Sequence, residues 1–593
     1  MTTHITQFRL TALILLMLPL LVISCYKIDA EGFAVPSPDF SFTAAEMNIA
    51  NTADTIEISV NANLPWRVAT NASWITLLES KGMTSGKIRA VVTQNKDVAA
   101  RTAEIFGYIT ADAKVKLTII QAKGDPLPTT YKVFYVKTTG ADTKDGLSWA
   151  NATTLDAALT KAASGDTIHV AEGTYVPATT ITGGDAAIAG DKTFEIDENV
   201  TIIGGYPANA ATGAIANAAL YTTTLSGNDI SYHTVVITAQ PIGGRQVSLK
   251  GLTITKGHAA GSGTVTVNGV GVIRNYGGGM VIGNAKVEMD SCKVIDNKSD
   301  LHIPGIYILN LADVTLKHTS ISLNTALTNA SSNAAGIWNN GCTLRMYDSE
   351  ITGNQVTGVG GGIYSLNTSI VSYNFLYNVT IADNKVGSAT TTNRVGAGIY
   401  SREKSQFTIV NCTFYNNTNT SSGSSGFGAG LTAYGGSTIN IINCTFTKNT
   451  GGTGNTATNG GSAIFNNNSP TANTINIYNS VIAGNQGYSS EVGGANISIK
   501  SSVTGSAVYN YSGAIEAGQS FDAATMFGTY ANHGGFGYNI PVVAGSHAAS
   551  TLGMTDLQLQ ALAGNLLLDN NYYLKDQNHR SRTGSTTMGA ALP

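Results

Sequence analysis

The sequence predicts an all-β protein in which a small β-sandwich precedes a right-handed, single-stranded parallel β-helix, a solenoid with an N-terminal cap. Three observations predict this class. A short motif ending in asparagine recurs about every thirty residues, and a second motif, made of a small residue, a glycine and an apolar residue, recurs with the same period. No segment with helical periodicity is long enough to form alternating β and α units, so folds of that kind are excluded.

Composition narrows the class of protein further. The 593 residues are enough for two or three domains, and 34 Lys and Arg against 37 Asp and Glu give a net charge of −3. A nucleic-acid partner is therefore not expected. Charged residues make up only 12% of the chain and glycine contributes 66 residues, which is typical of a long β protein with many tight turns.

The first residues have the layout of an export signal. Residues 1–24 combine a short polar start with the apolar run Leu10–Ile23, which is too short for a permanent membrane span. Val22-Ile23-Ser24-Cys25 resembles the bacterial lipobox. This resemblance implies that Cys25 carries a lipid that anchors the chain in a membrane, with residues 25–39 as a tether. The alternative is an ordinary secretory peptide that contains a cysteine.

The expected location is the outer membrane, as a lipoprotein at the cell surface. Residues 26–31 carry only a weak acidic export signal, so exposure outside the cell and exposure to the periplasm both stay open.

Residues 40–122 predict the small sandwich. Polar and apolar residues alternate in three stretches within this segment, as in strands with one buried face (55–60, 87–92 and 114–119). The order of Trp66, Trp74, Gln94-Asn95, Arg101 to Ile105 and a closing Ile119-Ile120-Gln121 resembles the BACON domain of Bacteroidota surface proteins. That resemblance implies either carbohydrate binding or a spacer.

Trp66 and Trp74 are the candidate sugar platforms of this domain. Both fall inside apolar strand patterns, which favours the alternative that they are core residues.

A linker at 123–130 with two prolines separates the sandwich from the body at 131–593. The body opens with an apolar strand (134–137), a Gly-Leu-Ser-Trp segment (146–149), an apolar-periodic stretch (155–159) and a second strand (165–175). This string resembles the N-terminal cap and first coil of pectate-lyase-like β-helix proteins. A cap is physically required, because a stack of coils exposes an unpaired sheet edge and an apolar core.

The repeat predicts coils stacked in register. Its asparagines lie 27, 30, 30, 33, 32 and 36 residues apart, at Asn297, Asn324, Asn354, Asn384, Asn417, Asn449 and Asn485. Asparagines at one turn position of successive coils are expected to form a ladder of amide hydrogen bonds. Ile399 is expected to point inward, whereas the facing of Thr408 is open.

Four further cysteines, Cys292, Cys342, Cys412 and Cys444, are expected to be buried thiols. Cys412 and Cys444 occupy the same place in successive coils, and a disulfide between them is the less favoured alternative.

The paired motifs resemble the repeats of chlamydial polymorphic outer membrane proteins, which are β-helical adhesins. Residues 414–417 and 446–449 match the second tetrapeptide outright, and other repeats replace Phe with Ile. The run from Asp576 to Arg582 with Thr587 to Ala590 resembles the closing segment of bacterial surface β-helix proteins.

For function, an enzyme and a binding protein stay in competition. Many β-helix proteins are polysaccharide lyases or glycoside hydrolases. A lyase needs a base and a cation that neutralises the uronate, often with calcium, and Lys317 and Arg345 are the candidates here. They belong to a dense charged set spread over three coils: Asp290, Lys293, Asp296, Asp300, Lys317, His318, Arg345, Asp348 and Glu350.

Strand alternation places such residues on an outer face in any β-helix, so surface decoration explains them as well. No Asp-Asp pair suggests a hydrolase. The favoured reading is a non-catalytic surface adhesin or glycan-binding protein without metal or cofactor, whose ligand is a glycan or host-surface material.

Overall fold

A computed structural model describes residues 37–593 apart from short gaps at 96, 111–113, 125–129, 327, 329–331, 389–393, 422–426, 453–459, 489, 506, 510–514, 518–522, 550–551, 567 and 569–571, and it leaves the side chains of 507–509 and 515–517 undescribed. The described residues form two compact units. One consists of residues 37–50, 54–92 and 101–122, and the other of 51–53, 93–100 and 123–593.

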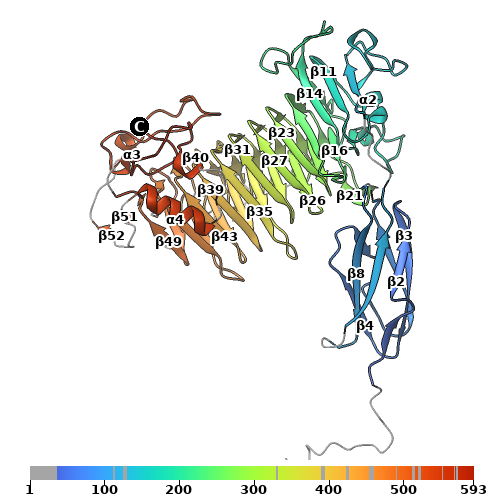
Figure 1. Ribbon diagram of the computed structural model, residues 1–593. Helices are drawn as coiled ribbons and strands as arrows, with labels where there is room; N and C mark the ends of the chain where they lie inside the picture. Colours follow the sequence, from blue (N-terminus) through green and yellow to red (C-terminus); the bar gives the residue numbers. More distant parts are fainter. Residues whose placement is uncertain are drawn as a thin grey trace, which may run out of the picture. The chain divides into compact units, whose positions relative to one another are not determined.

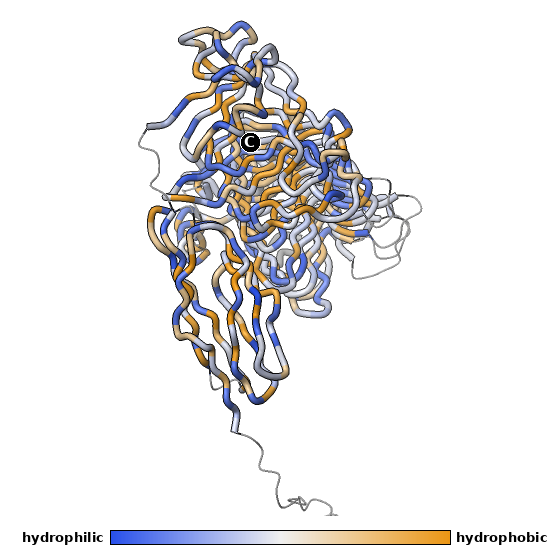
Figure 2. The backbone as a smooth tube through the Cα atoms, turned by 90° about the vertical axis from the view of Figure 1, so that its right-hand side faces the viewer, coloured by the Kyte–Doolittle hydropathy of each residue, from blue (hydrophilic) through white to orange (hydrophobic). Residues whose placement is uncertain are grey.

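The first unit is a β-sandwich of two sheets (Figure 1). Its four-stranded sheet has the order β1-β3-β7-β5 and its five-stranded sheet the order β2-β9-β8-β4-β6. Apolar and polar residues alternate along these strands, as Figure 2 shows, and the apolar faces enclose one core. The strands are Phe40–Phe42, Glu46–Ile49, Asp54–Ala62, Trp66–Thr70, Ile75–Leu77, Lys81–Gly82, Gly86–Val92, Arg101–Tyr108 and Lys114–Gln121 for β1 to β9.

The second unit is a parallel β-helix, so the predicted fold class is confirmed. Its coils build four sheets, named here sheets 1 to 4. A coil with a strand in every sheet passes through them in the order sheet 3, sheet 1, sheet 2 and sheet 4, as in β22-β23-β24-β25. Within each sheet the strands of successive coils pair in parallel, as in β23-β27, β24-β28 and β26-β30.

Sheet 1 has twelve strands: β10 (Val133–Val136), β11 (Thr167–Ala171), β14 (Thr201–Tyr206), β17 (Val247–Lys250), β23 (Lys286–Asp290), β27 (Asp313–Lys317), β31 (Thr343–Tyr347), β35 (Ser372–Tyr377), β39 (Ser405–Val410), β43 (Thr438–Ile442), β46 (Thr474–Tyr478) and β49 (Ile497–Lys500). Sheet 2 has thirteen: β12 (Gly173–Tyr175), β15 (Thr223–Ser226), β18 (Leu252–Thr255), β24 (Lys293–Ile295), β28 (Ser320–Ser322), β32 (Glu350–Thr352), β36 (Thr380–Ala382), β40 (Thr413–Tyr415), β44 (Thr445–Thr447), β47 (Val481–Ile482), β50 (Ser502–Thr504) and the antiparallel additions β51 (Ala507–Tyr509) and β52 (Ile515–Ala517).

Sheet 3 has ten strands: β13 (Phe194–Ile196), β16 (Val235–Ile237), β22 (Met280–Gly283), β26 (Ile306–Leu309), β30 (Ile337–Asn339), β34 (Ile363–Ser365), β38 (Ile399–Arg402), β42 (Leu431–Tyr434), β45 (Ile464–Asn467) and β48 (Val492–Gly494). Sheet 4 has six: β19 (His258–Ala259), β25 (Lys298–Ser299), β29 (Thr325–Ala326), β33 (Gln355–Val356), β37 (Lys385–Val386) and β41 (Thr418–Asn419). The hairpin β20 (Thr264–Val267) and β21 (Val270–Ile273) packs its valines against the outer face of sheet 3.

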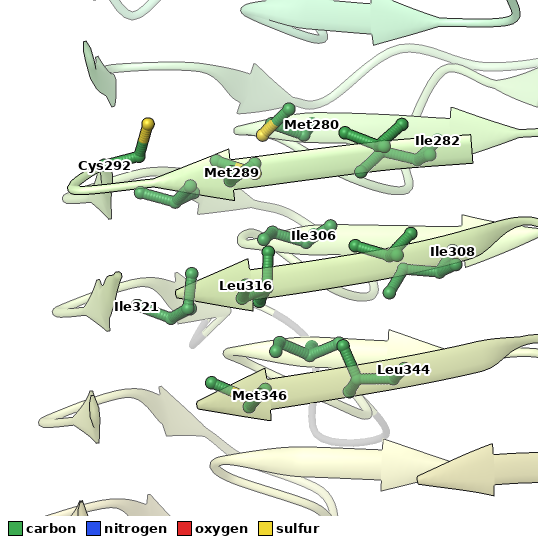
Figure 3. Close-up of a cluster of buried hydrophobic side chains, with 14 of the residues drawn as sticks. Met280, Ile282, Met289, Cys292, Ile306, Ile308, Leu316, Ile321, Leu344 and Met346 are labelled. Carbon is green, nitrogen blue, oxygen red and sulfur yellow. The ribbon is translucent and has the colours of Figure 1, made fainter. Parts of the chain in front are cut away.

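The core of the β-helix is a stack of aliphatic side chains. Figure 3 shows inward residues of successive coils in layers, with Leu316 lying between Met289 of one neighbouring coil and Met346 of the other. Ile399 is fully buried and pairs with Ile363 on one side and Leu431 on the other, so its predicted inward facing is confirmed. Thr408, whose facing was open, points outward and is half-buried.

The predicted asparagine ladder is present at the turn between sheets 2 and 4. The side-chain amide of each buried asparagine from Asn297 to Asn449 donates to the side-chain oxygen of the next one at 2.8–3.0 Å. The ladder ends on Glu491, whose carboxylate accepts from the side-chain amide of Asn485 at 2.6 Å. Turn groups that would otherwise be buried without partners are thereby satisfied.

The four described cysteines are buried free thiols, as predicted. Cys292, Cys412 and Cys444 occupy one position, directly before the sheet 2 strand, in three different coils. Burial raises the pKa of the Cys292 and Cys342 thiols to about 12. These groups therefore act as small apolar core residues.

The end of the ladder predicts a pH dependence of stability. Burial raises the pKa of Glu491 from its ordinary value of 4.5 to about 7, because burial outweighs the hydrogen bonds from Gly484 and Asn485. The folded state therefore holds this proton more tightly than the unfolded state does. Its contribution to stability is complete below pH 4.5 and is lost as the pH rises through 7, by on the order of 3 kcal/mol.

We expect Glu491→Gln to flatten the fall in unfolding free energy between pH 4.5 and 7.5, measured by urea titration at several pH values. Equal slopes for the two proteins would contradict the assignment.

Short helices and the C-terminal segment complete the unit. Helix α2 (Leu155–Lys161) packs Leu155 and Ala158 onto the core at its N-terminal end, as the predicted cap requires. The C-terminal segment runs back along sheets 1 and 2 and contains α3 (Ala523–Met526), α4 (Asp556–Leu566) and the 3-10 turns η3 (His547–Ala549) and η4 (Tyr572–Leu574). Two further 3-10 turns, η1 (Trp149–Asn151) and η2 (Ala189–Asp191), lie near the N-terminal end of the unit. Among the described residues, no helix has the length and apolar character to cross a membrane.

Arg582 holds the C-terminal segment together. Its guanidinium group is fully buried and donates to the main-chain oxygens of Lys575 at 2.8 Å and Thr587 at 2.9 Å, and also to those of Gly589 and Ala590. Burial lowers the pKa of Arg582 to about 10, so the group stays charged at neutral pH.

Candidate functional site: a groove on the outer face of sheet 1

The outer face of sheet 1 carries three rows of side chains that cross the coils. One row runs Lys250, Asp290, Lys317, Tyr347 and Tyr377, each paired with the next in register. The middle row runs Ser248, Glu288, Thr315, Arg345 and Phe375. The third row includes Lys286, Asp313 and Thr343. Period-2 alternation places all these residues outward while their neighbours fill the core.

Helix α4 and turn η4 cover the C-terminal half of this face. Leu559 and Met554 pack with Tyr377, Val410 and Ile442 in one apolar cluster. Figure 1 shows α4 lying across the C-terminal strands of sheet 1. Towards the N-terminal coils, this cluster extends only as far as Tyr347 on β31. Strands β23 and β27 contribute no described residue to it.

A pocket of about 490 Å³ lies where the cover stops. It is formed by outward residues of β23, β27 and β31, by Gln246 from the preceding coil and by Tyr572 from the C-terminal segment. Its lining residues are Gln246, Lys286, Glu288, Asp313, Thr315, Lys317, His318, Arg345, Tyr347, Asp348 and Tyr572.

Most charges in this pocket are paired across neighbouring coils. Lys317 lies 3.1 Å from Glu288, and Arg345 forms an ion pair with Asp313. The imidazole of His318 lies 2.9 Å from Asp290. A cation that already has a carboxylate partner is less available to neutralise a second one, so these pairs suit hydrogen bonding better than general acid–base chemistry.

One end of the pocket is aromatic. Tyr347, Tyr377 and Tyr572 form a cluster, named here the tyrosine wall, with ring centroids 5.3–5.7 Å apart. The buried carboxylate of Asp348 fixes this wall, since it accepts from the Tyr572 hydroxyl at 3.1 Å and from the Asn378 amide at 2.9 Å. It also lies 2.7 Å from His579.

A second pocket of about 640 Å³ adjoins the first towards the N-terminal coils. The two pockets share Gln246 and Glu288, so together they form one groove along sheet 1. Its other lining residues are Tyr131, Gly165, Asn199, Thr201, Gly244, Arg245, Ser248 and Lys250.

The structure brings some of the sequence-predicted residues together and separates the rest. Lys317, His318, Arg345 and Asp348 line the first pocket, and Asp290 pairs with His318 beside it. The others lie elsewhere: Lys293 and Glu350 on sheet 2, Asp296 in an ion pair with Lys256, and Asp300 beside His258.

The sandwich tryptophans are not open platforms. Trp66 is 4% exposed and donates from its indole nitrogen to the main-chain oxygen of Thr84, which corrects its candidacy as a sugar-stacking residue. Trp74 is half-buried against the core, and the Arg101 guanidinium lies 4.4 Å from its ring centre. Cys25 lies outside the described residues.

Several groove residues were missed by sequence reasoning. Glu288, Asp313 and Tyr347 stand at alternate strand positions beside the predicted set, so the strand pattern carried their signal. Tyr572 had no such signal, because its place depends on how the C-terminal segment folds back. No group of three or more His, Cys, Asp or Glu side chains within the described part of the chain is arranged to hold a metal ion.

No protein-family model matches the chain, and no curated protein matches it. Among solved structures it is similar to the pectate lyase Pel9A, with 13% identity over 63% of this chain and 80% of that chain and a TM-score of 0.37. A Bacteroides ovatus GH5 xyloglucanase in complex with a XXXG heptasaccharide matches with 12% identity over 34% of this chain and 46% of that chain, with a TM-score of 0.14. Similarity at this level does not identify what the chain binds.

Proposed function

We propose that this chain is an outer-membrane lipoprotein, exposed at the cell surface, whose sheet 1 groove binds a glycan. One observation carries the binding proposal: the open part of sheet 1 forms an elongated groove lined by hydrogen-bonding side chains and ending at the tyrosine wall. Sugar rings present hydroxyls at their edges and apolar C–H faces, which match this combination.

The sandwich serves as a BACON-like spacer in this proposal. Trp66 is buried and the ring of Trp74 is covered by Arg101, which supports a structural role for these residues over sugar stacking. The resemblance of Val22 to Cys25 to a lipobox supports the lipid anchor, and nothing in the composition supports a nucleic-acid partner.

The second candidate function is a polysaccharide lyase, with calcium as its expected cofactor. It is favoured by the presence of Lys317 and Arg345 in the same pocket, beside Glu288 and Asp313. The carboxylate partner of each cation argues against it, since both cations are already neutralised.

The test uses the chain from residue 26 onward on an array of plant, bacterial and host glycans. We expect binding to at least one glycan, and Tyr347→Ala should weaken it about fivefold because a stacking ring is lost. Tyr373→Ala is the matched control, since Tyr373 is an exposed tyrosine of the same sheet outside the pocket lining. Its affinity should equal that of the wild type.

If no glycan binds, or if both variants lose the same affinity, the groove is not the binding site. Uronate polymers incubated with the protein and calcium should give no ultraviolet absorbance from unsaturated products. Absorbance that disappears in Lys317→Ala or Arg345→Ala would establish the lyase instead.

The anchor has its own test. Cys25→Ala should move the protein from the membrane fraction to the soluble fraction, because the lipid is the proposed attachment. Retention of the variant in the membrane fraction would exclude a lipid on Cys25 as the attachment.

A further inference from the structure

The two halves of the groove differ in charge. Around the first pocket, the carboxylates of Glu288, Asp313 and Asp290 each have a basic partner. The second pocket contributes the cations Arg245 and Lys250, and Lys286 on strand β23 lines the first pocket. Within the described residues, none of these three cations forms an ion pair with a carboxylate.

Arg245 is held in place by contacts that leave its charge uncompensated. Its guanidinium lies 4.5 Å from the centre of the Tyr131 ring, donates to the main-chain oxygen of Ser164 at 2.5 Å and donates to the Tyr131 hydroxyl. All three partners are neutral. A guanidinium fixed in this way loses little side-chain entropy when it binds an anion.

The positions of the cations relative to the tyrosine wall are fixed by strand register. Lys250 and Tyr347 stand in one row of sheet 1, separated by the residues of β23 and β27. Three inter-strand steps correspond to about 14 Å. Several sugar rings of one chain can therefore contact the paired-charge half and the tyrosine wall while another part reaches the free cations.

From this arrangement we propose that the ligand is an acidic glycan, bound with its sulfate or carboxylate groups at Arg245, Lys250 and Lys286 and with an uncharged sugar ring against the tyrosine wall. This inference rests on the proposed glycan binding and specifies its substrate class. The net charge of −3 gives no sign of it, because that number sums all charged residues of the chain and is not changed by where these three cations lie.

The experiment measures the affinity of the chain from residue 26 onward for hexasaccharides of one galactan backbone in three forms: neutral, sulfated and oxidised to uronate. We expect at least one acidic form to bind about tenfold more tightly than the neutral form, and its advantage to shrink as the salt concentration rises from 50 to 500 mM. Comparison of the sulfated and uronate forms distinguishes the two sources of the anion.

Lys250→Gln combined with Lys286→Gln should abolish the advantage of the acidic form, so that the acidic and neutral forms bind the variant with about the same affinity. The control combines Lys293→Gln with Lys385→Gln, which removes the same charge from exposed lysines outside the groove. It should behave like the wild type.

Equal affinity for the neutral and acidic forms, or equal effects of the two double variants, would overturn this inference while leaving glycan binding intact. The absence of binding by all three forms, together with a blank array, would overturn the proposed function as well.

Discussion

Ile399→Asp is expected to destabilise the β-helix by about 4 kcal/mol or more, the largest effect of any single change considered for the core. Ile399 is fully buried between Ile363 and Leu431 in neighbouring coils. A carboxylate at this position would enter an aliphatic stack in which no partner is available. Neighbouring coils would lose their packing as well, because each coil is stabilised mainly by contact with the next.

The measurement is thermal and urea unfolding followed by circular dichroism, with Thr408→Asp as the control. Thr408 lies in β39 of the same coil and points outward, so a charge there stays in contact with solvent. Its change in stability should stay within about 0.5 kcal/mol. Similar unfolding of both variants would show that the assigned facing of these strands is wrong.

The second large effect is expected for Arg582→Met. The buried guanidinium donates to four main-chain oxygens, and a methionine would leave those oxygens without their donor. We expect a loss of about 3–5 kcal/mol from the C-terminal segment. Released from the coils, residues 552–593 should be cut by protease at concentrations that leave the wild type intact.

Loss of the segment should also weaken the proposed glycan binding, because Tyr572 comes from it. Lys575→Met is the matched control, since Lys575 lies in the same segment with an exposed side chain. Protease resistance of the Arg582 variant equal to that of the control would mean that the segment does not depend on the buried guanidinium.

The fold of the repeated part can be predicted from the sequence because every coil must stack its turns on those of the next coil and satisfy the same buried polar groups. A regular spacing of Asn354, Asn384 and Asn417 can arise only if their turns stack, and the ladder then follows from amide chemistry. The same reasoning placed Ile399 inward. The local strand pattern around Thr408 was ambiguous, and only the hydrogen-bonded register resolved it.

The groove was only half predictable. The sequence identifies the cations Lys317 and Arg345 as candidates. Their carboxylate partners, Glu288 and Asp313, depend on diagonal contacts between coils that have no fixed sequence separation. The tyrosine wall was beyond prediction, since Tyr572 meets Tyr347 across more than two hundred residues of chain. Such a long-range contact leaves no periodic trace in the sequence.

The C-terminal segment also constrains how this architecture can change its length during evolution. It is bound to particular coils by hydrogen bonds. The hydroxyl of Tyr572 donates to the carboxylate of Asp348, and the side-chain amide of Asn479 donates to the main-chain oxygen of Thr587. Duplication of a coil between these two points would shift one set of anchor points against the other. A coil duplicated between Asn297 and Asp348 would instead extend the asparagine ladder and the groove together, without moving these two anchor points against each other.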